Sequence, residues 1–297
     1  MLLRASPVPC SGGYHRLDTA HGIAKALAID LLRSWLEFPP SFRQPISMTQ
    51  SLRRDPGNAA RDEDGFPNRG AEVTRAEAFF DAAFAFAITL MVISIDAIPD
   101  TAEKLVDALK SVPAFAASFM LIVLFWRGHA DWSRRFGMND RYSQRLSLLL
   151  VFIVLVFIYP LRMVFSSFFP FVTGGWLPAQ IHLETVSDVR AMFIVFAVGF
   201  GSMGASMCLL YRHAWSRRDD LGLDAVERLQ TRYAALRWAL IPVVSVLSLG
   251  ISVFLLREGT TSNLLMAMPG LIFFALNIAH VLLGRRLRRA RMALQST

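Results

Sequence analysis

Six long apolar runs, separated by short charged loops, occupy the chain from residue 76 onward. A helix needs about 20 residues to cross the hydrocarbon layer of a bilayer, whereas a barrel strand is about half as long and alternates in polarity. The runs do not alternate; five are long enough, and residues 105–108 can extend the second outward. They cover roughly residues 76–95, 112–126, 146–171, 191–211, 236–256 and 264–284. We therefore predict an all-α, polytopic integral membrane protein with six transmembrane helices.

Basic residues alternate between two sets of loops. Residues 53–75 before the first run, the second-to-third loop, the fourth-to-fifth loop and the C-terminal end hold 21 Lys or Arg, and the opposite loops hold four. Because cytoplasmic loops carry the Lys and Arg excess, both termini are predicted to be cytoplasmic. The net charge of +8 is then explained by topology and lipid head groups, and no nucleic-acid partner is expected.

The composition changes near residue 75. Arg, Asp, Pro and Gly are frequent before it, which is typical of a polar tail. Within this tail, apolar residues at 23–36 recur at helical spacing and would also suit a helix on the membrane surface, although a start at Met48 would remove them. The predicted domains are a mobile cytoplasmic N-terminal tail at 1–74, a transmembrane domain at 75–290 and a short tail at 291–297.

No catalytic or metal-binding motif is found in this sequence. The six His lack zinc-protease spacing, Cys10 and Cys208 imply no disulfide framework, and we expect neither an enzyme nor a cofactor. A dinucleotide-type glycine pattern lies inside an apolar run rather than at a strand-to-helix turn, so it predicts close helix packing through small residues. Its glycines are Gly199, Gly201 and Gly204, followed by Asp219, and the small pairs are Gly201 with Ala205 and Ser202 with Ser206. The segment 173–176 is expected to be an ordinary outer turn.

The first apolar run carries a carboxylate, which is costly in a membrane and therefore a functional candidate. Asp81 lies about one turn inside the run and Arg75 lies at its edge, about 120° away around a helix. The second run ends at the same side with Trp126 and His129, one turn apart. We predict an interhelical polar network of these four residues, with snorkelling to the interface as the alternative. Arg162, in the third run, has no assigned role.

Residues 74–96 read TRAEAFFDAAFAFAITLMVISID. This stretch resembles the signature of the transmembrane protein 175 family, the lysosomal potassium channels and their bacterial homologues. That family begins its first helix with Arg-x-x-x-Phe-Ser-Asp, followed by a run like AFAIAITLLVL, and Arg75, Phe79 and Asp81 match. Trp126 and His129 resemble the W-x-x-H of its second helix. The resemblance covers roughly residues 72–290.

The resemblance implies a potassium-permeable cation channel that has no carbonyl filter. Chains with one repeat, as here, resemble the bacterial members, which implies a homotetramer in the bacterial plasma membrane with potassium ions and the lipid bilayer as partners. The first helix of each subunit would line the pore. Its hydrophobic constriction would fall at Phe86, Leu90 and Ile93, with Thr89 beside it. A helix places these three within about 40° of one line and turns Asp81 away from it.

Two positions depart from the family pattern. Phe80 replaces the Ser of the signature, and Phe86 replaces an Ile at the constriction, where a ring of four Phe would close more tightly and gate by dewetting. Two other functions therefore stay open: a secondary transporter or proton-leak pathway, and a non-conducting membrane scaffold. Asp96 and Asp100, after the first run, would either attract cations or simply be solvated.

Overall fold

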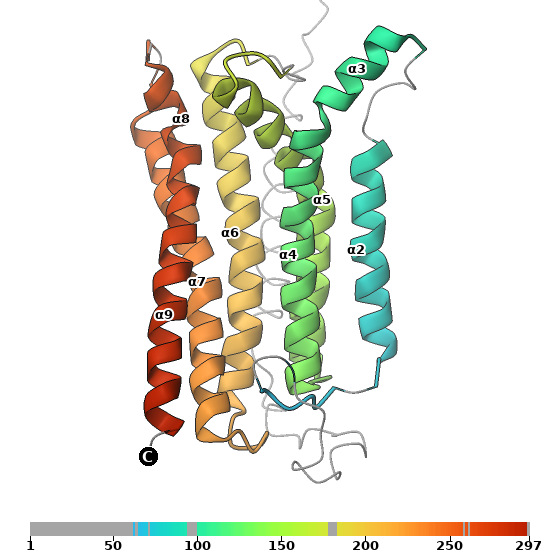
Figure 1. Ribbon diagram of the computed structural model, residues 1–297, viewed down its shortest axis with the longest axis vertical. Coiled ribbons are helices and arrows are strands. Elements are labelled where there is room, and N and C mark those ends of the chain that lie inside the picture. Colours follow the sequence, from blue (N-terminus) through green and yellow to red (C-terminus); the bar gives the residue numbers. More distant parts are fainter. Residues whose placement is uncertain are drawn as a thin grey trace, which may run out of the picture. The chain divides into compact units, whose positions relative to one another are not determined.

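The regular secondary structure of the described residues is helical, which confirms the predicted all-α class. The computed structural model describes residues 62, 65–70, 72–93, 100–177, 183–257, 259–260 and 262–295, so Cys10, Asp96 and the amphipathic stretch at 23–36 lie outside it. The helices are α2 (Arg75–Ile93), α3 (Ala102–Lys110), α4 (Val112–Phe136), α5 (Arg141–Val172), α6 (Val186–Ser216), α7 (Ala225–Phe254), α8 (Asn263–Leu271) and α9 (Ala275–Gln295), with the 3-10 turn η4 (Ile272–Phe274) joining the last two (Figure 1).

The described residues of the first five predicted apolar runs each lie mainly in one helix, and the sixth run spans α8, η4 and the first half of α9. Five stretches of the described residues are long and apolar enough to cross a membrane: Val112–Phe136, Arg141–Val172, Val186–Ser216, Ala225–Phe254 and Leu264–Ala293. The first run forms α2, whose 19 residues span roughly 28 Å at about 1.5 Å per residue and include the charged residues Arg75, Glu77 and Asp81. The protein is thus a multi-pass membrane protein, and a sixth span through α2 stays a prediction.

The helices extend well beyond the apolar runs because their ends are fixed by caps in the polar loops. The side chain of Asp140 caps α5, and capping boxes begin α6 at Thr185 and α7 at Asp224. Two expectations change. Residues 105–108 belong to a separate helix, α3, which ends at Ser111 rather than extending α4. Residues 291–295 continue α9 instead of forming a tail, since no Gly or Pro interrupts them.

The arginine-rich segments gather at one end of the helices. The turns between α4 and α5 and between α6 and α7 lie at the end where α9 finishes (Figure 1). The residues before α2 reach the same end, where the Gly70 N–H donates to the Arg134 carbonyl over 2.9 Å. The alternation of charge along the sequence therefore corresponds to two ends of one helical assembly. Which end faces the cytoplasm stays a prediction.

Helices α6 and α7 make the closest helix pair, and the glycines of α6 are the reason. A methyl group at Gly204 would lie 2.5 Å from Ile241, and one at Gly201 would lie 2.9 Å from the Ser245 side chain. Real side chains do not approach so closely, so only glycine permits this backbone separation. The packing role predicted for Gly201 and Gly204 is confirmed.

Replacing Gly204 with Ala should therefore destabilise the protein. We expect Gly204→Ala to lower the free energy of unfolding by about 1–3 kcal/mol, because the added methyl must displace Ile241. Thermal unfolding in detergent measures the effect. Gly250→Ala is the matched control, since a methyl group there meets no atom within 4 Å. Equal midpoints for the two variants would contradict the packing role.

Candidate functional site on helix α2

Helix α2 has one packed face and one open face. Phe80, Phe84, Ala87 and Met91 are buried against the neighbouring helices α4 and α5. These positions are spaced by four, three and four residues, so they form one stripe along the helix. Phe86 lies on the opposite side with 56% of its surface exposed. The packed stripe fixes how the helix is rotated and therefore which side chains face away from the protein.

Two of the four residues predicted to form a polar network are joined directly. The Trp126 indole N–H donates to an Asp81 carboxylate oxygen over 2.8 Å, which links α2 to α4. Both side chains lie at the edge of the helix pair and remain partly exposed. The bond gives the Asp81 carboxylate a partner from another helix, as the sequence predicted for Asp81.

His129 has different partners from those expected. Its Nε2 is 2.8 Å from the Ser147 hydroxyl of α5, and its ring lies edge-on to Phe80 with centroids 5.2 Å apart. Phe80 fills the space between α2 and His129. Arg75 starts α2 on its open side, and within the described residues it makes no hydrogen bond or ion pair. The predicted network is therefore a set of separate contacts.

Glu77 is the polar residue of α2 that sequence reasoning missed. Its carboxylate accepts from the Thr74 N–H over 2.6 Å, and the Thr74 hydroxyl accepts from the Glu77 N–H over 3.2 Å, forming a capping box. The other Glu77 oxygen accepts a hydrogen bond from Ser133 of α4. The pattern T-x-x-E at 74–77 was the signal available in the sequence. Glu77 therefore both starts α2 and joins it to α4.

A polar cavity of about 180 Å³ lies behind the start of α2. It is enclosed by the segment 69–74, the first turns of α2, the end of α4 and the start of α5. Glu77, His129, Ser133 and Ser147 line it. A cavity of this size and polarity has room for a few water molecules of about 30 Å³ each. The buried polar groups at this end of α2 are thus arranged around a space that suits water.

The described residues before α2, namely 62, 65–70 and 72–74, form a strap that is packed against the arginine-rich end. Phe66 is only 1% exposed and its ring lies edge-on to Phe136 at 5.5 Å. The guanidinium groups of Arg69 and Arg135 lie 5.5 and 5.3 Å from the same ring. The strap differs from the predicted mobile tail ending at residue 74, because an aromatic anchor and several ion pairs hold it.

Those ion pairs connect the strap to two other helices. Arg69 donates to Glu227 of α7 over 2.8 Å, with side chains 11% and 5% exposed, and the Arg135 Nε donates to Asp62 over 2.9 Å. Glu227 also accepts the Asp224 N–H in the capping box of α7. A methyl group at Gly70 would lie 2.6 Å from the Ser133 carbonyl. The strap thus holds the start of α2 close to the last turn of α4 and the first turn of α7.

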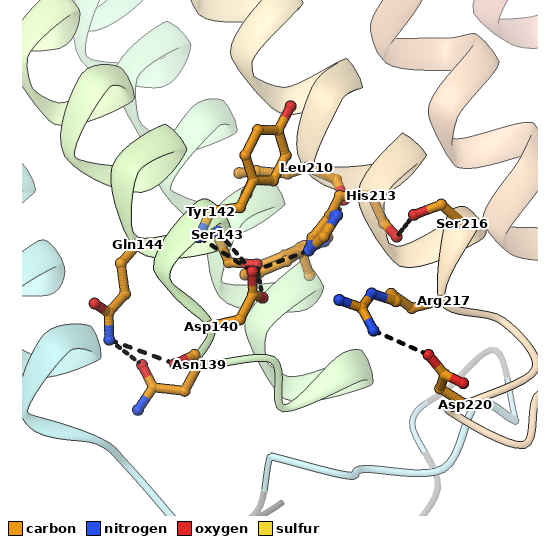
Figure 2. A network of polar contacts seen from close by, with 11 residues as sticks. Asn139, Asp140, Tyr142, Ser143, Gln144, Leu210, His213, Ser216, Arg217 and Asp220 are labelled. Atoms are coloured by element: carbon orange, nitrogen blue, oxygen red, sulfur yellow. Dashed lines mark hydrogen bonds and ion pairs between the residues drawn. The ribbon is translucent and has the colours of Figure 1, made fainter. Parts of the chain in front are cut away.

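A second polar cluster joins α5 to α6 at the same end (Figure 2). The His213 Nε2 donates to Asp140 over 3.1 Å, and Asp140 accepts from the Ser143 hydroxyl over 2.6 Å. Burial raises the pKa of the Asp140 carboxyl, but the hydrogen bonds from His213 and Ser143 outweigh burial and hold the pKa well below its usual range. The rings of Tyr142 and His213 lie 4.7 Å apart. This cluster positions the α4–α5 turn next to the polar cavity.

The predicted constriction residues take different positions. Phe86 and Thr89 lie on the open side of α2, whereas Leu90 is half-buried and packs against the core. The Thr89 hydroxyl donates to the Phe86 carbonyl over 2.7 Å, which leaves its oxygen lone pairs directed away from the backbone. Ile93 ends α2, and its side chain lies outside the described part of the chain.

The remaining candidates lie away from this site. Asp100 is exposed and bridges Lys104 over 2.7 Å. Arg162 is half-buried on α5. Residues 173–176 form turns in which Gly174 and Gly175 have positive φ values of 61° and 88°, which confirms the ordinary turn predicted there.

The fold and the site define a polytopic α-helical membrane protein whose first described long helix has one open, largely apolar face. A family model described as "Endosomal/lysosomal potassium channel TMEM175" matches residues 75–160, which include α2 and α4. A potassium channel from Marivirga tractuosa is 29% identical over 190 residues, covering 62% of this chain and 76% of that protein. The crystal structure of a variant of the potassium channel MtTMEM175, in complex with a Nanobody-MBP fusion protein, superposes with a TM-score of 0.63 at 24% identity, covering 77% of this chain and 100% of that one.

The chain is similar to the TMEM175 family over residues 75–160. The matched segment contains the first-helix residues Arg75, Phe79 and Asp81 and the pair Trp126 and His129, so the resemblance carried by these residues is confirmed.

Removing the indole donor at Trp126 should loosen α2. We expect Trp126→Phe to lower the free energy of unfolding by about 0.5–1.5 kcal/mol, because Asp81 loses its partner on α4. Chemical unfolding in detergent micelles measures the change. Trp176→Phe serves as the control, since Trp176 is 73% exposed in a loop turn. A loss no larger than that of the control would mean that the bond contributes nothing.

The Asp140 cluster predicts a pH dependence of stability. Asp140→Ala removes both the cap of α5 and the hydrogen bond from His213, so it should lower the free energy of unfolding by about 1–3 kcal/mol. Asp140→Asn keeps a capping oxygen, so it should lower the free energy of unfolding by less. The pKa of Asp140 in the folded protein lies below its unfolded value of about 3.9. The ionised carboxylate therefore stabilises the folded protein at pH values above about 3.9, and this stabilisation is lost only at lower pH. The difference in melting temperature between wild type and Asp140→Asn should therefore not shrink between pH 8 and pH 5. A shrinking difference would contradict this assignment.

Proposed function

We propose that this protein is a potassium-permeable cation channel whose pore is lined by α2. The observation that carries the proposal is the one-sided packing of α2: Phe80, Phe84, Ala87 and Met91 face the protein, while Phe86 faces away. A chain with one α2 cannot enclose a path with it alone. Several copies must therefore contribute, and we propose four.

The open face of α2 has the chemistry of a hydrophobic gate. Phe86 would form an apolar ring that blocks ions by dewetting when the ring is narrow. Thr89, one turn further, offers hydroxyl oxygens to a partly dehydrated cation. Arg75 lies at the start of this face and Leu90 at its border. In this proposal Leu90 and Ile93 complete the constriction of Phe86, and no carbonyl filter takes part.

The polar contacts behind α2 would then hold the pore helix in place. Asp81 is bonded to Trp126, Glu77 is bonded to Ser133, and the strap fixes the first turn. These groups lie on the side facing α4 and α5, so their role would be to position the pore-lining face rather than to contact ions. We place the channel in the bacterial plasma membrane as a homotetramer.

Shortening the aromatic side chain at the gate should make the channel leak. We expect Phe86→Ala to raise basal potassium current several-fold in planar bilayers, because a wider apolar ring stays wet. Recordings under potassium and sodium gradients, on protein whose mass in detergent has been measured, test the proposal. Unitary current steps support a channel. Slow, saturating exchange would identify a carrier instead, and silence in both wild type and variant would indicate a scaffold.

Cysteine accessibility provides the matched control for the location of Phe86. In a background with Cys10→Ser and Cys208→Ser, cysteines at 86 and 89 should react with charged thiol reagents and change the current. A cysteine at Phe84 faces the core, and one at Val246 is on an exposed face of α7, 65% exposed in wild type. Neither should react from water. If position 86 behaves like position 246, α2 does not line an aqueous path.

A further inference from the structure

The final turns of α9 carry an unusual concentration of positive charge. Five arginines fall between residues 285 and 291, and α9 contains no acidic residue. Four of them are exposed: Arg285, Arg286, Arg288 and Arg289. Within the described residues, none of these four forms an ion pair. This end of α9 therefore presents four guanidinium groups that no ion pair neutralises among the described residues.

These arginines lie on the same line as the apolar surface of α9. At about 100° per residue, Ile278, Leu282, Arg285 and Arg289 fall within about 30° of one line. Ile278 and Leu282 are 67% and 53% exposed, as expected for side chains that face lipid chains. The stripe therefore changes from apolar to basic as it leaves the hydrocarbon layer, which places Arg285 and Arg289 at the level of lipid head groups.

Helix α7 repeats this arrangement beside α9. Arg232 is exposed and lies on one line with Leu236 and Val243, which are 47% and 56% exposed. The His280 Nε2 donates to the Arg237 carbonyl over 3.2 Å and fixes the register of the two helices. Arg232 and Arg285 each lie five residues from this bond toward the arginine-rich end, about 8 Å along the axis. The two side chains are thus at the same depth.

Several of the described acidic residues near this end bind other arginines. Glu227 binds Arg69, Asp62 binds Arg135, and Asp219 binds Arg228. The basic residues on the α7 and α9 surface therefore differ from these three arginines, which pair with acidic residues. In the part of the chain that the structure describes, the surface residues have no ion-pair partner, and they lie on a face that continues the apolar stripe.

We propose that Arg232, Arg285, Arg288 and Arg289 form a binding site for the head group of an anionic phospholipid. Guanidinium groups bind phosphate oxygens through paired N–H donors, and basic clusters at the ends of transmembrane helices bind anionic lipids. The exposed apolar side chains next to the arginines would contact the acyl chains of the same lipid. The site is independent of conduction, because it lies on α7 and α9 and not on α2.

The test compares lipid retention by full-length variants. Wild type and Arg285→Gln/Arg288→Gln/Arg289→Gln are reconstituted in nanodiscs with equal amounts of phosphatidylglycerol and phosphatidylcholine, re-extracted in detergent, and their retained lipids are quantified by mass spectrometry. We expect wild type to retain phosphatidylglycerol over phosphatidylcholine by roughly tenfold and the variant by about twofold or less. Addition of inorganic phosphate should not displace the lipid.

A second triple variant removes the same charge from the same end. Arg217→Gln/Arg218→Gln/Arg228→Gln affects arginines that pair with Asp219 and Asp220, and it should retain phosphatidylglycerol like wild type. If both variants lost retained phosphatidylglycerol to the same extent, net charge alone would explain the retention, and the proposed site would be wrong. Unchanged retention in the α9 variant would also overturn it, as would displacement by phosphate. A smaller oligomer for the α9 variant would show that this face binds another copy of the chain.

Discussion

The packing of α2 by a single face governs the arrangement of the candidate site. A helix of 19 residues with three charged side chains in its first two turns is poorly suited to stand alone in a bilayer, so its position must come from its neighbours. Phe80, Phe84 and Met91 supply apolar contact with α4 and α5. Asp81 and Glu77 each find a donor on α4. The apolar and the polar contacts are thus made in the same orientation of α2 about its axis, and in this orientation Phe86 points away from α4 and α5.

The strap extends this control beyond the membrane-embedded residues. Phe66 is held between two guanidinium groups, one of which, that of Arg69, also binds Glu227 of α7. Because Glu227 belongs to the capping box of α7, the start of one helix is chemically connected to the entry of another. A buried ion pair contributes little net stability when both partners are present, but removing one leaves an uncompensated charge. The connection therefore specifies geometry more than it adds stability.

The sequence predicted the features that depend on composition and period, and it failed where a tertiary contact decides. Apolar runs located every long helix, and Gly204 was correctly assigned to packing because a fingerprint glycine has no other use inside an apolar helix. The resemblance implied a pore-line position for Leu90, which stays a prediction, and only the structure shows that Leu90 is half-buried against the core while Phe86 is exposed. Phe66 lies in a polar, charged segment whose composition resembles a tail, and only the fold shows that two arginines and Phe136 bury it. Local composition does not reveal which distant residues complete a site.

The exposed apolar faces of α9 and α2 carry their polar residues at different positions along the helix. This difference distinguishes a candidate lipid face from a candidate pore face. The stripe of α9 ends in Arg285 and Arg289, which suits the head-group layer of a membrane. The face of α2 instead places Thr89 one turn from Phe86, within the helix. The Thr89 hydroxyl donates to the Phe86 carbonyl, and in the proposed pore its lone pairs would be open to water or a cation. The position of polar groups along each face, rather than exposure alone, therefore separates the proposed lipid face from the proposed pore face.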